Sequence, residues 1–126
     1  MRAETPPQAG ADISALDCSK LCRLITVMEA AFGPRAPLRQ TQTLVALALA
    51  GEPMSRLDVA RKVGAPDQTT HVDLMTLGRE QRNGTPGLRL VERRPDPVHR
   101  GQFAYSVKPR GRAILEQLVA ALGQRA

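Results

Sequence analysis

Residues 90–107, LVERRPDPVHRGQFAYSV, place the tightest constraint on what this chain can fold into. Both ends have the composition of strands, and Phe103, Tyr105 and Val107 alternate with polar or small residues, as in a strand with one buried face. The middle contains two prolines and charges of both signs, which suits neither a two-residue turn nor a flexible tether. The pattern predicts a hairpin with a long, stiff, charged tip.

Helical spacing of apolar residues dominates the rest of the chain. It predicts helices over about residues 14–33, 38–50, 56–63, 68–81 and 110–123, with a short extended piece near residues 52–54. No strand–helix alternation appears, which argues against a doubly wound parallel sheet. We therefore expect a mainly α fold with a small antiparallel β-hairpin, preceded by a flexible leader over residues 1–13 and forming a single domain over residues 14–126.

The helix boundaries and buried faces can also be predicted. Ser55 and Asp67 are candidate N-caps for the third and fourth helices. The fourth helix should bury Thr70, Leu74 and Leu77. For the second helix, which looks like a buried central helix, the expected apolar stripe is Leu38, Thr41, Leu44, Val45, Ala48 and Leu49.

Composition narrows the class of partner. Only Phe32, Phe103 and Tyr105 are aromatic, which argues against proteins that stack single-stranded bases on aromatic platforms. The formal net charge is +6, and residues 51–112 carry twelve basic and seven acidic side chains. A basic excess concentrated in this half of the chain indicates a polyanionic partner.

Two short helices joined by a turn over residues 55–81 form a helix-turn-helix candidate, and a hairpin with a basic tip follows directly. With GLRLVERRPDPVHRGQFAYSVKPRGRAILEQL at residues 87–118, this region resembles the MarR-type winged helix-turn-helix regulators. The resemblance covers about residues 38–122, and the hairpin, or wing, is its most specific part. This chain departs from the family pattern at His99, Gly101 and Lys108, and its linker over residues 79–87 is longer.

The resemblance implies a DNA-binding transcriptional regulator, more specifically a repressor, that acts as a homodimer through helices at about residues 14–33 and 110–123. The fourth helix would read bases in a double-stranded operator, with the candidates Gln68, Thr69, His71 and Val72 facing outward. Asp73, on the same helix, should disfavour close approach of phosphates.

In the predicted wing, Asp96 would bond the guanidinium of Arg100 and hold it at the tip for the minor groove. Arg93 and Arg94 would contact phosphates at the base of the wing. Further backbone contacts are expected from the basic residues around the helix-turn-helix: Arg56, Arg61, Lys62, Arg79 and Arg82.

Two other readings remain open. The winged domain could bind an acidic protein instead of DNA. Alternatively, Cys18 and Cys22, four residues apart on the first helix, could form a redox sensor on a DNA-binding regulator, although buried, inert thiols are the simpler expectation.

Other kinds of function find no support in the sequence. The cysteine spacing does not suit zinc, and no phosphate-binding loop or nucleophile elbow occurs, so we expect no metal, no cofactor and no enzymatic activity. The sequence also lacks a signal-peptide pattern and an apolar run of membrane-spanning length, which predicts a cytoplasmic protein without a membrane partner.

Overall fold

The computed structural model describes residues 15–81 and 83–123, so the predicted leader over residues 1–13 lies outside the described residues. The element order matches the one predicted. It is α1 (Ala15–Phe32), α2 (Leu38–Ala50), β1 (Met54–Ser55), α3 (Arg56–Val63), α4 (Asp67–Leu77), β2 (Val91–Pro95), β3 (Phe103–Val107) and α5 (Pro109–Leu122). The predicted fold class, mainly α with a small antiparallel sheet, is confirmed.

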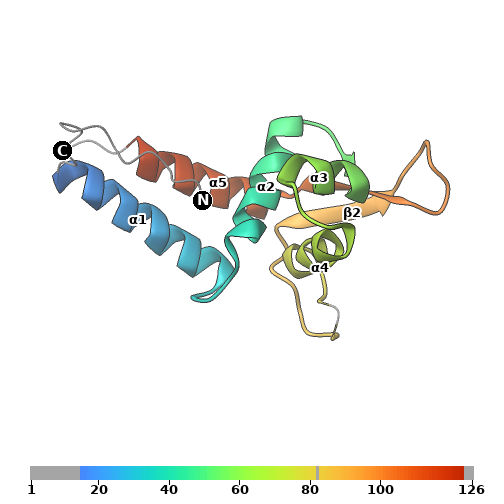
Figure 1. Ribbon diagram of the computed structural model, residues 1–126, viewed down its shortest axis with the longest axis horizontal. Helices are drawn as coiled ribbons and strands as arrows, with labels where there is room; N and C mark the ends of the chain where they lie inside the picture. Colours follow the sequence, from blue (N-terminus) through green and yellow to red (C-terminus); the bar gives the residue numbers. More distant parts are fainter. Residues whose placement is uncertain (1–14, 82, 124–126) are drawn as a thin grey trace, which may run out of the picture.

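The elements form two ends joined by α2 (Figure 1). At one end α1 and α5 pack along each other, and at the other the loop between β2 and β3 projects away from the body. Helices α3 and α4 lie beside α2, between these two ends. No helix among the described residues has both the length and the apolar character needed to cross a membrane.

Helix α2 is central, as predicted, but its buried face is not the predicted one. Leu44 is buried as expected, whereas Leu38 and Leu49 are 62% and 82% exposed. The other buried residues of this helix are Gln40, Thr43 and Leu47. The run VALALA is apolar on every side, so sequence periodicity alone does not determine which side faces inward.

The small sheet has the strand order β1-β3-β2, with both pairs antiparallel. The extended piece predicted before α3 is β1, which pairs Met54 with Tyr105 at the centre of β3. Tyr105 is buried, as the alternation predicts, but Phe103, the first residue of β3 after the loop, is 38% exposed.

The first strand of the hairpin begins at Val91. The backbone N–H groups of Leu88 and Leu90 donate to the carbonyls of Thr76 and Leu77, at 2.8 Å each, which ties this segment to the last turn of α4. The recognition-helix candidate and the wing are therefore connected by hydrogen bonds as well as by the chain.

The start of α5 is also fixed to this junction. The backbone N–H of Lys108 donates to the carbonyl oxygen of Leu90 at 2.9 Å. Gly111 is buried, and a Cβ atom at this position would collide with the same carbonyl oxygen. Glycine at 111 therefore permits α5 to pass directly over the base of the wing.

Candidate nucleic-acid interface

The helix-turn-helix predicted over residues 55–81 is formed by α3 and α4. Ser55 caps α3, because its side-chain oxygen accepts from the backbone N–H of Asp58 at 3.2 Å. Gly64 ends α3 in the left-handed conformation, at φ 77°, which favours glycine, and Pro66 precedes the first residue of α4. The turn between the two helices is therefore short and sharply defined.

Asp67 does not cap α4, contrary to the prediction, because it is already the first helical residue. Its carboxylate instead accepts from Nε of Arg56 at 2.8 Å, which links the first turns of α3 and α4. Arg56 was predicted to contact the DNA backbone. In the structure its guanidinium is paired with Asp67.

Helix α4 buries the predicted face and exposes another. Thr70, Leu74 and Leu77 are all buried. Of the predicted base-reading residues, Gln68 is exposed and Thr69 and Val72 are half-buried. The exposed and half-buried face thus begins in the first turn of α4, which is the part of a recognition helix that usually contacts bases.

His71, another predicted base-reading residue, is half-buried. Its Nδ1 atom is buried and has no hydrogen-bond partner among the described residues. A base edge or a phosphate could therefore be contacted only through the other ring nitrogen, Nε2.

Asp73 was predicted to disfavour the approach of phosphates to the outer face of α4. This prediction is wrong, because its side chain points into the protein. The carboxylate is buried and accepts two hydrogen bonds from Arg39 of α2, from Nε at 2.8 Å and from Nη2 at 3.4 Å. The hydrogen bond to Asp73 and the charge of its carboxylate raise the pKa of Arg39 above its usual value. The pair thus fixes α4 on α2 and removes a negative charge from the outer surface.

The tip of the wing is held by Asp96, but not through Arg100 as predicted. One carboxylate oxygen of Asp96 accepts from the backbone N–H groups of Val98 and His99, at 2.8 and 3.3 Å. The other lies 3.4 Å from Nδ1 of the His99 ring. An aspartate that bonds to the backbone two and three residues ahead closes a turn, and this arrangement leaves the guanidinium of Arg100 exposed to solvent.

These contacts also affect the titration of Asp96. The hydrogen bond from the Val98 amide is the largest influence and lowers the pKa of Asp96 below its usual value. The amide and ring of His99 act in the same direction.

The two arginines at the base of the wing each have a partner in the hairpin itself. The guanidinium of Arg93 lies over the ring of Phe103, 4.1 Å from its centroid. Nε of Arg94 donates to Glu92 at 2.6 Å. Both side chains remain exposed, so a phosphate could still reach them.

The remaining predicted backbone contacts differ in their availability. Lys62 is exposed and forms no ion pair among the described residues, whereas Arg61 lies 3.5 Å from Asp58. Arg79 is exposed just beyond α4, and Arg82 lies outside the described residues. Arg61, Lys62 and Arg79 are therefore more exposed to solvent than Arg56.

Cys18 and Cys22 are exposed on α1, which contradicts the expectation of buried thiols. On α1, Met28, Ala31 and Phe32 near its C-terminal end pack on the hydrophobic core, and the two cysteines lie nearer its other end. No group of three or more potential metal-ligating residues occurs within residues 15–81 and 83–123.

Sequence reasoning missed the role of Arg39. Its position in α2 resembles that of any surface arginine, and Asp73 lies 34 residues further along the chain. The only available signal was an acidic residue, Asp73, adjacent to the predicted apolar stripe of α4.

No family profile and no curated protein sequence matches the chain. Solved structures do match. A probable transcriptional regulator from Pseudomonas aeruginosa is 22% identical, with a TM-score of 0.58 over 90% of this chain and 78% of its own. A MarR family transcription regulator is 21% identical, with a TM-score of 0.58 over 82% of this chain and 60% of its own.

A MarR-like transcriptional regulator from Thermotoga maritima is 16% identical, with a TM-score of 0.52 over 88% of this chain and 77% of its own. At these identities the likeness concerns the fold. The chain therefore has the winged helix-turn-helix fold found in MarR-type transcriptional regulators.

Proposed function

We propose that this protein is a sequence-specific, double-stranded DNA-binding transcriptional regulator that acts as a homodimer and represses by occupying its operator. The observation that carries the proposal is the placement of α4 beside a stiff basic wing. The first turn of α4 presents Gln68, and the wing presents an exposed Arg100 on a tip held by Asp96. A recognition helix and an adjoining arginine-bearing wing can enter a major groove and the neighbouring minor groove.

The charge of the chain supports a nucleic-acid partner. The basic excess lies in residues 51–112, which contain α3, α4 and the wing. Burial of Asp73 against Arg39 leaves fewer exposed negative charges on α4 than its sequence indicates. Affinity would then come from phosphate contacts and specificity from the outer face of α4.

The other end of the molecule supports a dimer. Helices α1 and α5 pack along each other and still expose large apolar side chains, namely Leu21, Ile25, Val119 and Leu122. A second copy packed on these helices would bury them. It would also place two α4 helices on one face of the DNA, about 10 base pairs apart on a pseudo-palindromic site.

The structural neighbours favour a binding role over catalysis. The three described above are named as transcriptional regulators. Another similar structure, with a TM-score of 0.56, concerns regulation of DNA binding in Bordetella bronchiseptica BpsR. Those names describe the neighbours. We infer that this chain likewise binds DNA and regulates transcription.

In vitro selection from random duplex DNA tests the proposal. We expect enrichment of one inverted repeat, and loss of preference at one base pair per half-site in Gln68→Ala. Analytical ultracentrifugation should show a dimer for the wild type and a monomer for Ile25→Lys. Absence of binding to any duplex at low salt would refute DNA recognition, and binding to an acidic protein would then support the alternative of a protein-interaction module.

A further inference from the structure

A cleft of about 790 Å³ opens on one side of α4, away from its first turn. Its walls are the end of α4, the long segment between α4 and β2, the hairpin and Lys108 before α5. From the segment between α4 and β2, Arg79, Glu80, Gly84 and Pro86 form one wall of this cleft. Cavities of this size accommodate small ligands.

The charge lining the cleft is mainly positive. Four cationic side chains line it, those of Arg79, Arg89, Arg93 and Lys108. The two acidic side chains in the lining are Glu80 and Glu92, and Glu92 already accepts from Arg94. None of Arg79, Arg89 and Lys108 forms an ion pair with any residue that the structure describes, so their charges are not neutralised.

The backbone around Arg89 is held in place from two sides. Arg89 has a φ of 60°, in the left-handed region that side-chain-bearing residues rarely adopt. Its N–H donates to the carbonyl of Gly78 at 2.9 Å, and the neighbouring Leu90 carbonyl accepts from Lys108. These bonds bring Arg89 and Lys108 to the same part of the cleft, although they are far apart in sequence.

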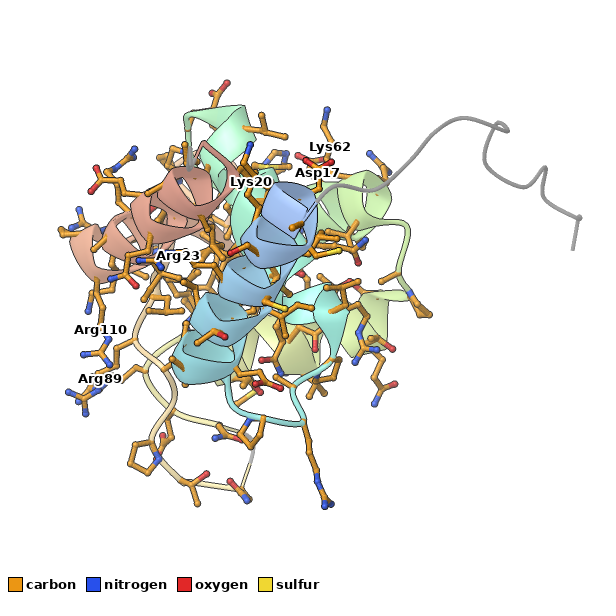
Figure 2. All side chains as sticks on the ribbon, turned by 90° about the vertical axis from the view of Figure 1, so that its left-hand side faces the viewer. Asp17, Lys20, Arg23, Lys62, Arg89 and Arg110 are labelled. Carbon is orange, nitrogen blue, oxygen red and sulfur yellow. The ribbon has the colours of Figure 1, made fainter. Side chains whose placement is uncertain are left out.

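The surrounding surface adds to the positive charge. In Figure 2, Arg89 and Arg110 project from the same edge of the molecule, and Arg23 of α1 lies on the same side. The first turn of α5 contains no acidic residue. The N-terminal end of α5 therefore adds its own positive potential beside the cleft and carries no opposing side chain.

We propose that this cleft is a binding site for a small phosphate-bearing anion with more than one negative charge. Guanidinium groups bind phosphate oxygens in a bidentate manner, and several cations around one concave surface favour a multiply charged ligand. The buried residues Leu74, Val91 and Tyr105 also line the cleft, beneath the charged side chains. Arg79 and Arg93 are also predicted DNA-backbone contacts, so the cleft overlaps the proposed DNA-binding surface, and its test is therefore made without DNA.

Isothermal titration calorimetry of the full chain with inorganic pyrophosphate, at constant ionic strength and without DNA, tests the site. We expect saturable binding of one pyrophosphate per chain. Affinity should fall by at least about tenfold in Arg89→Gln/Lys108→Gln. The matched control Arg61→Gln/Lys62→Gln removes the same charge outside the cleft and should change affinity by less than about twofold.

Any of three calorimetric results would overturn the proposal: no saturable binding, an equal loss in both double variants, or equally tight binding of the monoanion benzoate. Amide chemical shifts of the wild type give a second readout that does not require the variants to fold. On titration with pyrophosphate, shifts should concentrate at residues 79–93 and 105–108. Shifts spread over all the basic surfaces would also overturn it.

Discussion

Arg39 of α2 and Asp73 of α4 form a two-point ion pair, with Nε–Oδ2 and Nη2–Oδ1 distances of 2.8 and 3.4 Å. Asp73 is only 2% exposed, so its carboxylate depends on Arg39 for compensation. Together with the buried Thr70, Leu74 and Leu77, the pair determines how α4 is seated on α2. The packing of α4 on α2 therefore determines which way Gln68 and its neighbours face.

Replacing Arg39 should destabilise the protein. In Arg39→Leu the carboxylate of Asp73 would remain buried without its partner, and we expect Tm to fall by roughly 10 °C. Differential scanning calorimetry measures the change, with Arg35→Leu, an exposed arginine before α2, as the control. An unchanged Tm in Arg39→Leu would show that the pair does not hold α4.

Asp96 should titrate below its ordinary pKa. The amide of Val98 and then the amide and ring of His99 stabilise its charged form in the folded protein. A folded-state pKa below the unfolded value means that Asp96 contributes stability above the unfolded pKa, and that this contribution is lost as pH falls through the folded pKa. Carboxyl-carbon NMR between about pH 2 and 6 should show this depressed pKa.

The same contacts predict an effect on the wing. Asp96→Ala should make the tip of the wing more mobile. A mobile tip loses more conformational entropy when it binds than the wild-type tip does, so we expect DNA affinity to fall by about threefold. The pKa prediction fails if Asp96 titrates at or above the value of an unstructured aspartate. The tip prediction fails if Asp96→Ala binds DNA as tightly as the wild type.

Gly111 should not tolerate a side chain. In Gly111→Ala the new Cβ would collide with the carbonyl oxygen of Leu90 and press on Val107, so either α5 or the base of the wing must move. We expect a loss of about 3 kcal/mol in the free energy of unfolding. Urea denaturation tests this, with Gly123→Ala as the control, where the nearest atom to the new Cβ is at an ordinary 3.6 Å.

Cys18 and Cys22 should not contribute to DNA affinity under reducing conditions. Both lie on α1, at the opposite end of the molecule from the wing (Figure 1). We expect Cys18→Ser/Cys22→Ser to bind the selected duplex with wild-type affinity in fluorescence anisotropy. Release of DNA by peroxide from the wild type, but not from the double variant, would instead support a redox sensor formed by Cys18 and Cys22.

The order of the elements, the wing and the buried face of α4 could be predicted from the sequence because each depends on local patterns. Alternating residues mark β3, and Ser55 and Gly64 mark the ends of α3. The buried face of α2 could not be predicted, because an apolar run permits several faces. The partners of Asp73 and Asp96 were also missed, since Arg39 is distant in sequence and a turn-closing aspartate bonds to backbone groups that carry no sequence signal.

The dependence of DNA affinity on salt tests the central claim most directly. Anisotropy titrations should use the selected duplex and a scrambled duplex over a series of salt concentrations, with the wild type and Arg100→Ala. We predict tighter binding to the selected duplex, a steep loss of affinity with salt, and for Arg100→Ala an affinity about tenfold lower with a slope smaller by about one. Equal affinity for both duplexes, or no binding at low salt, would contradict the assignment of this protein as a sequence-specific DNA-binding regulator.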